Sequence, residues 1–119
     1  MKRWLCLTAA ISSALTILAM WALGWTDLSS TVKLENARVR VTEVTSAPGG
    51  MRERGVRGHD QVIVFLDDCT YQRTDPVTGE KTIRERKSGE VIWHNKGEDA
   101  PQLVNAGLRP YRTLVVELK

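Results

Sequence analysis

Beyond residue 27 the chain has no stretch of helical periodicity and instead consists of short segments patterned for strands. No window of about 11 residues there repeats apolar positions at helical spacing. Residues 61–66 are apolar on both faces, which is typical of a strand buried between two layers. Pro and Gly at 48–50 and 75–79 interrupt the pattern with turn chemistry. Short strands separated by turns about every ten residues predict an all-β sandwich or barrel.

The expected strands follow from alternation between polar and apolar side chains. In the first of them, Val39 and Val41 alternate with Arg38 and Arg40. Two segments around the turn at 75–79 are expected to pair antiparallel. The strands are predicted at residues 34–44, 61–66, 69–73, 81–86, 90–94, 102–105 and 112–118.

An apolar block precedes these strands. Lys2 and Arg3 are followed by no charged residue from Trp4 to Trp25. A signal peptide and an uncleaved membrane anchor both fit this block, and a buried core helix is a further alternative. In the first two alternatives the basic end stays inside the cell and the rest of the chain lies on the other side of the membrane. In a bacterium, the domain would then be in the periplasm, or it would be anchored in the inner membrane and face the periplasm.

The predicted domain division follows from this block. Residues 1–25 form the signal peptide or membrane anchor, which is one apolar helix, and residues 26–36 contain a linker and a first strand. Residues 26–31 are polar and rich in Ser, as expected for the linker. Residues 37–119 form the folded domain.

Charge and cysteine content exclude some classes of protein. The chain has 17 basic and 14 acidic residues, and without Lys2 and Arg3 the basic count falls to 15, so the predicted domain has little net charge. Nucleic-acid binding needs clustered basic residues, and acidic neighbours interrupt the basic groups here. Cys69 is the only cysteine after the apolar block, so no disulfide within the domain can stabilise it.

The C-terminal segment, residues 89–119, has a pattern of glycines followed by an asparagine and a closing apolar strand. Gly89 and Gly97 are separated by seven residues, and Asn105 follows. This pattern resembles the second sequence motif of the cupin family, with one residue inserted before the asparagine. In that register Pro101 stands where cupins have a metal-binding histidine. The resemblance implies a cupin-like jelly-roll barrel, also called a double-stranded β-helix, over residues 37–119.

The first cupin motif has a counterpart without its metal ligands. Aligning the strand that starts near Asp60 puts Gly55 and Arg57 close to the two histidine positions and Gln61 close to the glutamate position. A catalytic metal needs about three protein donors, and the fixed charge of an arginine repels a cation. The resemblance therefore implies a barrel without a metal cofactor, in which Arg57 favours an anion.

Alternate residues of barrel strands point inward, and on this basis a ligand pocket is predicted. An arginine near aromatic side chains in an apolar cavity forms a carboxylate clamp. The alternative is that Trp93 belongs to the core and the arginines form a solvated face. The predicted ligand-binding residues are Arg57, Gln61, Tyr71, Arg73, Trp93 and Asn105.

Three functional hypotheses follow. The first is a non-enzymatic exported domain that binds a small, anionic ligand. The second is a metal-dependent oxygenase or isomerase, in which His59 and His94, joined by Glu98 or Asp99, bind a divalent metal at a displaced site. The third is a protein-interaction module, including a homodimer, because an exposed edge strand can pair with another chain.

Overall fold

The residues that the structure describes, 27–119, form strands and connecting loops. The eleven strands of this computed structural model are β1 (Leu28–Glu35), β2 (Val39–Ser46), β3 (Met51–Arg52), β4 (Gly55–Val56), β5 (Asp60–Phe65), β6 (Cys69–Thr74), β7 (Lys81–Arg86), β8 (Val91–His94), β9 (Asp99–Ala100), β10 (Gln102–Asn105) and β11 (Tyr111–Leu118). A helix long and apolar enough to cross a membrane is not found among these residues. The apolar helix expected over residues 1–25, as signal peptide or anchor, lies outside the described part.

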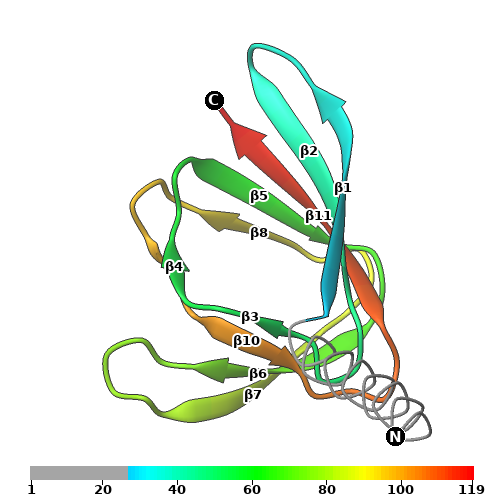
Figure 1. The fold of residues 1–119 in the computed structure, drawn as a ribbon, viewed down its shortest axis with the longest axis vertical. Helices are drawn as coiled ribbons and strands as arrows, with labels where there is room; N and C mark the ends of the chain where they lie inside the picture. Colours follow the sequence, from blue (N-terminus) through cyan, green and yellow to red (C-terminus); the bar gives the residue numbers. More distant parts are fainter. Residues whose placement is uncertain (1–26) are drawn as a thin grey trace, which may run out of the picture.

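The strands form two facing sheets and a small third one. The five-stranded sheet has the order β1-β2-β11-β5-β8, and the four-stranded sheet has the order β3-β10-β6-β7. Figure 1 shows these two sheets opposite each other, with β4 at one side between them. Strand β4 pairs with β9 in the two-stranded sheet. The all-β barrel expected from the sequence is thus confirmed.

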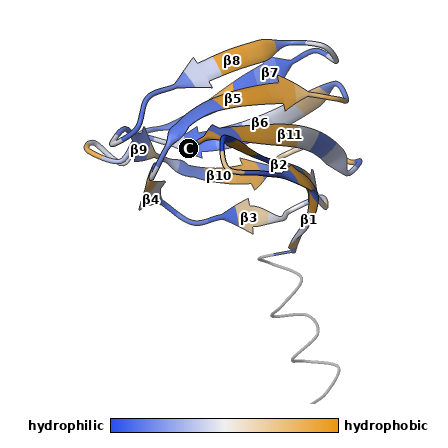
Figure 2. Cartoon of the chain, turned by 90° about the horizontal axis from the view of Figure 1, so that it is seen from above, coloured by the Kyte–Doolittle hydropathy of each residue, from blue (hydrophilic) through white to orange (hydrophobic). Residues whose placement is uncertain are grey.

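The core lies between the two large sheets. Ile63 and Phe65 of β5, Tyr71 of β6 and Tyr111 of β11 are its buried apolar side chains. The rings of Phe65 and Tyr71 stack in parallel, with centroids 6.4 Å apart. Figure 2 shows hydrophobic segments on β5, β8, β10 and β11. This small core leaves room for a cavity inside the barrel.

Most strands lie where alternation and turn residues predicted them. Residues 81–86 and 102–105 match β7 and β10, and β5, β6, β8 and β11 agree within one residue at each end. The predicted antiparallel pairing of β6 with β7 is confirmed. At their turn, Asp75 accepts backbone hydrogen bonds through Oδ1, and Gly79 adopts a φ of 76°. The two-residue strands β3, β4 and β9 were not predicted, because so short a segment cannot show alternation.

The prediction of one continuous strand over residues 34–44 is wrong. Strand β1 ends at Glu35 and β2 begins at Val39, so a tight turn separates two paired strands. Asn36 forms this turn, because its Oδ1 accepts hydrogen bonds from the backbone N–H groups of Arg38 and Val39, at 2.7 and 3.0 Å. The turn contains neither Gly nor Pro, so the sequence pattern did not reveal it.

A first strand is predicted within residues 26–36, and β1 lies there. The linker predicted over 26–31 is wrong from Leu28 onward, because β1 pairs with β2 from Leu28 to Glu35. Strand β1 is at the edge of the five-stranded sheet and most of its residues are exposed. Polar side chains are tolerated at such an edge, which explains why this strand resembled a linker in the sequence.

Candidate functional site

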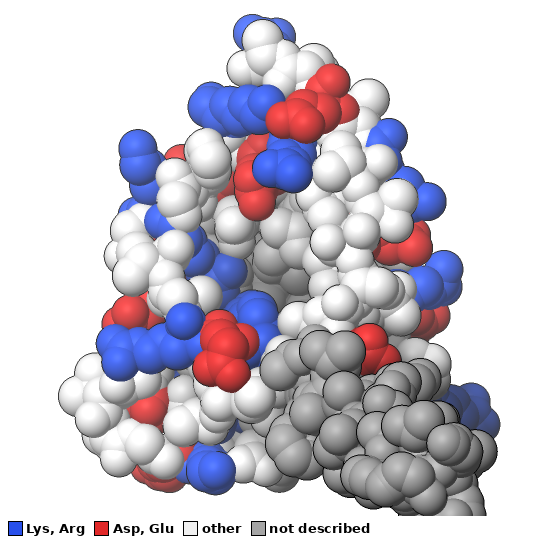
Figure 3. All heavy atoms as spheres, viewed as in Figure 1, with Lys and Arg blue, Asp and Glu red and all other residues white. Residues whose placement is uncertain are grey.

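A cavity of about 610 Å³ lies inside the barrel. Its two main walls differ in chemistry. The five-stranded sheet contributes apolar side chains, while the four-stranded sheet contributes arginines from β3, β6 and β7. The side chains that line the cavity from the first wall include Val44, Ile63, Phe65, Ile92, Tyr111 and Val115. The arginines that line it are Arg52, Arg57, Arg73, Arg84 and Arg86. Figure 3 shows a hollow between the two sheets with basic side chains beside it.

Strand pairing explains why the arginines share one wall. Arg52 of β3 and Arg73 of β6 are both opposite Leu103 of β10, so these three side chains lie in one row on one face of the sheet. In the neighbouring row Tyr71 is opposite Arg84. Because side chains alternate between the two faces of a strand, these two rows both face the cavity.

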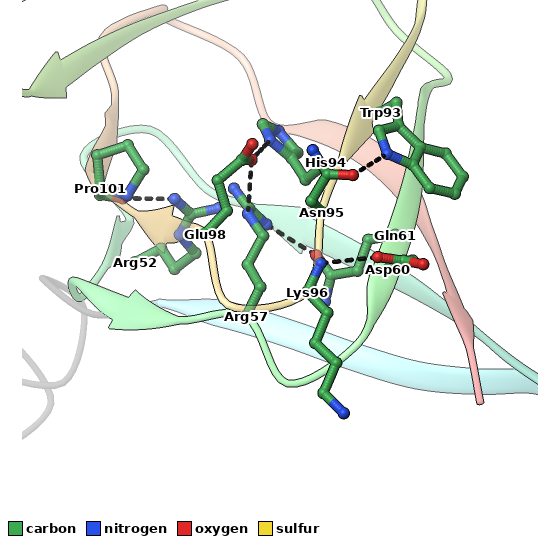
Figure 4. Close-up of polar contacts among 10 residues, drawn as sticks. All are labelled: Arg52, Arg57, Asp60, Gln61, Trp93, His94, Asn95, Lys96, Glu98 and Pro101. Carbon is green, nitrogen blue, oxygen red and sulfur yellow. Dashed lines mark hydrogen bonds and ion pairs between the residues drawn. The ribbon is translucent and has the colours of Figure 1, made fainter.

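Arg52, which is half-buried, and Arg57, which is buried, form a pair of cations at one end of the cavity. Arg57 is 7% exposed, and Figure 4 shows its guanidinium beside that of Arg52. Arg52 donates through Nη2 to the carbonyl of Pro101, and Arg57 donates through Nη1 to Oε1 of Gln61 at 2.7 Å. Among the described residues, the Nε atoms of both arginines are buried without a hydrogen-bond partner. Two buried donors of this kind are costly unless a ligand or water accepts from them.

The surroundings disfavour the charge on both of these arginines. Burial, and then the nearby charge of Arg57, lower the pKa of Arg52 to about 10. Burial also lowers the pKa of Arg57, against the opposing effect of Glu98. Because a guanidinium with a pKa of about 10 is still charged at neutral pH, the pair places two positive charges at this end of the cavity.

One carboxylate partly balances this pair. Oε2 of Glu98 lies 4.0 Å from Nε of Arg57, which is too long for a hydrogen bond. The same oxygen is 2.7 Å from Nδ1 of His94. The pKa of Glu98 is lowered, first by this contact with His94, and among the smaller causes by the charge of Arg57. The two arginines and Glu98 together carry one net positive charge.

A second group of arginines lies on β6 and β7. Arg73 is 3.9 Å from the carboxylate of Asp75, and Arg86 is 3.4 Å from that of Glu90. Nε of Arg86 also donates to the hydroxyl of Tyr71 at 3.3 Å. Within residues 27–119, Arg84 forms no ion pair with an acidic side chain. This group therefore also carries more positive than negative charge.

The structure brings three of the six predicted ligand-binding residues to the cavity. Arg57, Tyr71 and Arg73 line it. Gln61 does not line it but holds the guanidinium of Arg57 by its hydrogen bond.

The predictions for Trp93 and Asn105 are corrected. Trp93 is 50% exposed on the outer face of β8, because its neighbours Ile92 and His94 take the inward positions. Asn105 is 3% exposed and has a structural role. Its Nδ2 donates to the carbonyls of Ser46 and Arg109.

The structure does not bring both predicted metal ligands, His59 and His94, to the cavity. His94 lines the cavity, whereas His59 does not and is 3.7 Å from Glu117. Within residues 27–119, no three His, Cys, Asp or Glu side chains are grouped so that they could hold a metal ion. At the ligand positions that the cupin motifs imply, Arg57 donates to Gln61, and the carbonyl of Pro101 accepts from Arg52. Two guanidinium groups in this place do not fit a bound cation.

Three arginines of the site, Arg52, Arg84 and Arg86, were not predicted from the sequence as binding residues. Arg84 and Arg86 have a signal in the sequence, because they alternate on β7 and so share one face. The face of β7 that points inward depends on its pairing with β6. Arg52 has no such signal, because β3 is only two residues long and pairs with β10, far along the chain.

The described fold is similar to solved structures of cupins. No protein-family model matches the sequence, and no curated protein matches it. A cupin domain from Bordetella pertussis Tohama I superposes with a TM-score of 0.69 at 22% identity, over 77% of this chain and 93% of that one. A cupin superfamily protein from Desulfitobacterium hafniense DCB-2 superposes with a TM-score of 0.59 at 13% identity, over 77% of each chain.

An enzyme has a similar fold. The polyketide cyclase RemF from Streptomyces resistomycificus has a TM-score of 0.65 at 21% identity, over 80% of this chain and 67% of that one. At these identities the likeness concerns the fold. The resemblance read from residues 89–119 is therefore confirmed, and the chain has the cupin fold, a double-stranded β-helix.

Proposed function

We propose that the barrel binds a small ligand through a carboxylate group, with Arg52 and Arg57 as its binding residues. The observation that carries this proposal is the pair of buried Nε donors that have no partner among the described residues. Guanidinium groups bind carboxylates through paired, charge-assisted hydrogen bonds. The one net positive charge of Arg52, Arg57 and Glu98 suits a singly charged carboxylate better than a doubly charged phosphate.

The rest of the cavity supports a ligand with an apolar body. Ile63, Phe65 and Val115 face the arginine wall across the cavity. A volume of about 610 Å³ is within the range of pockets for small molecules. The proposed ligand is thus an organic acid with a hydrocarbon or aromatic part.

The proposal is for binding rather than catalysis. Burial is the main cause that raises the pKa of the Cys69 thiol to about 11, so this side chain is a poor nucleophile at neutral pH. His94 is engaged with Glu98 by a 2.7 Å contact. These features support a site that binds its ligand without nucleophilic catalysis by Cys69.

Calorimetric titration of the full-length chain with hexanoate, benzoate, phosphate and sulfate tests the proposal. The chain is kept in a mild non-ionic detergent because of its apolar first residues. We expect binding of the two carboxylates, and its loss in Arg52→Gln and Arg57→Gln. Arg54→Gln is the matched control, because Arg54 is exposed and pairs with Asp99. Carboxylate binding that survives both cavity substitutions, or no carboxylate binding at all, would contradict the proposal.

A second candidate function is self-association through the outer face of the five-stranded sheet. One row of apolar side chains crosses all five strands, since each member is opposite the next in the strand pairing. This row consists of Leu34, Val41, Val116, Val62 and Trp93. Val91, Val64 and Leu114 form the next row. We call these eight residues the outer apolar face.

The size and charge of the outer apolar face suit a second copy of this chain. Five strands about 4.8 Å apart, covered by two rows about 7 Å apart along the strands, present on the order of 300 Å² of apolar surface. A stable dimer buries roughly 800 Å² on each partner. The outer apolar face would therefore form the apolar centre of a dimer interface, and residues at its border would supply the rest. In these two rows β5, β8 and β11 contribute no charged residue, while Glu43 of β2 is opposite Leu114 at the border of the second row. Two copies can therefore bring the β5, β8 and β11 part of the face together with Glu43 at the border of the interface.

Cross-linking tests this candidate in cells that express the full-length chain. In a Cys6→Ser background, Val62→Cys or Val116→Cys is expected to give a product of twice the chain mass with a short bismaleimide. Val77→Cys is the control, because Val77 is 86% exposed at the β6–β7 turn. A product of another mass, equal yield from the control, or no product from either variant would argue against a dimer through this face.

We also propose that the domain is exported, on the basis of the apolar block in residues 1–25. Protease added to spheroplasts of an expressing bacterium is expected to digest the domain, and intact mass reports whether the block is cleaved. Protection until the cells are lysed would contradict export.

A further inference from the structure

We propose that the ligand is a dicarboxylic acid, whose second carboxylate binds to Arg84 and Arg73 on the far side of the arginine wall. This inference rests on the proposed function, because it takes Arg52 and Arg57 as the site of the first carboxylate. It adds a second subsite and defines the chemical class of the ligand.

The two groups of arginines are separated across the four-stranded sheet. Arg52 is on β3, at one edge, and Arg84 is on β7, at the other edge. Three strand spacings of about 4.8 Å put their backbones about 14 Å apart. Arg73, on β6, is two spacings or about 10 Å from Arg52 along the shared row. A ligand that contacts both groups of arginines would therefore extend across the sheet, with an acidic group at each end.

The charges at the second subsite also match a single carboxylate. Arg73, Arg84 and Arg86 contribute three positive charges, and Asp75 and Glu90 lie within 4.0 Å of two of them. One positive charge remains, and among the described residues it is Arg84 that has no acidic partner. Both ends of the cavity thus have one positive charge in excess of the nearby carboxylates.

The surface between the two subsites is apolar. Leu103 lies between Arg52 and Arg73 in their shared row, and Tyr71 is next to Arg84. Ile63 of the opposite sheet also lines the cavity. A hydrocarbon chain between two carboxylates would contact these side chains while its acidic ends contact the arginines. A free inorganic anion would leave this apolar surface uncovered.

Competition between diacids and monoacids tests the inference. The full-length chain is titrated with succinate, adipate and suberate, and with hexanoate and octanoate as monoacids of matched length. A second charge-assisted pair is expected to make the best diacid bind about tenfold tighter than its matched monoacid. Arg84→Gln and Arg73→Gln are expected to remove most of this advantage, and Arg109→Gln, in the exposed loop before β11, is expected to retain it.

The outcomes separate this inference from the proposed function. If monoacids bind in a manner that depends on Arg57 but no diacid binds more tightly, the second subsite is wrong and the first stands. If the diacid advantage persists in both Arg84→Gln and Arg73→Gln, the second carboxylate is bound elsewhere and the inference is wrong. If neither class of acid binds, both proposals fail.

Discussion

Replacing Arg52 with methionine is expected to stabilise the ligand-free protein while it removes carboxylate binding. Arg52 is retained in a position that disfavours its charge, since burial and the neighbouring Arg57 lower its pKa to about 10. Its Nε is also buried without a hydrogen-bond partner in the described part of the chain. Methionine keeps an apolar stem of similar length and has no charge to bury.

The size of this effect follows from the shifted pKa. A shift of about 2.5 pKa units corresponds to about 3 kcal/mol against the charged form in the folded state, and partial access of water makes this an upper bound. The substitution also removes the hydrogen bond from Arg52 to the carbonyl of Pro101, which costs about 1 kcal/mol. The net expectation is a gain of about 1–2 kcal/mol in the free energy of unfolding. For a domain of this size, each kcal/mol raises Tm by about 4–8 °C.

A change of pH near neutrality cannot measure the effect of Arg52 on the free energy of unfolding, so a substitution is needed. Because the pKa of Arg52 is lower in the folded state, its charge disfavours folding at every pH below about 10, and this penalty is relieved only as the pH rises above about 10. Between pH 6 and 8 this contribution is constant.

Urea unfolding of the full-length chain, followed by circular dichroism, measures the effect. Arg54→Met is the matched control, since Arg54 is exposed, and its free energy of unfolding should change by less than about 0.5 kcal/mol. The reasoning is refuted if Arg52→Met lowers the free energy of unfolding by more than 1 kcal/mol, because Arg52 would then stabilise the fold. It is also refuted if the variant still binds hexanoate with the affinity of the parent chain.

Three further predictions concern single positions. Gly50→Ala should destabilise the fold by about 2 kcal/mol or more, because its Cβ would lie 2.6 Å from the carbonyl oxygen of Asp27 and 2.8 Å from that of Ala47; an unchanged Tm would contradict this packing. Asn105→Ala should lower the free energy of unfolding by about 2–4 kcal/mol, since it leaves two backbone carbonyls and one N–H without their partner. A loss below about 1 kcal/mol in urea unfolding would contradict this, because water would then replace the amide. The thiol of Cys69, with its pKa of about 11, should react with iodoacetamide at pH 8 roughly a hundredfold more slowly than an unperturbed thiol, and equal rates in folded and urea-unfolded protein would disprove the burial effect.

Part of the candidate site could be predicted because it follows the alternation of side chains along strands. Tyr71 and Arg73 are two residues apart on β6, so they had to share a face, and that face lines the cavity. The same reasoning failed for Trp93, because alternation states that Trp93 and His94 face opposite ways but does not state which of them points inward. Asn105 was assigned to the pocket from its place in the motif, whereas its burial beneath the loop that precedes β11 gives it a structural role.

The sequence by itself determined the class of fold. Strand length, alternation and turn residues are local properties, and together with the glycine spacing in residues 89–119 they indicated the double-stranded β-helix that the structure has. Only the tertiary structure decided which side chains form the site. Arg52 and Pro101 are in contact because β3 pairs with β10 across about 50 positions of the chain. Such long-range pairing, together with the inward or outward direction of each strand face, is fixed by the packing of the sheets against each other and cannot be read from the local pattern of residues.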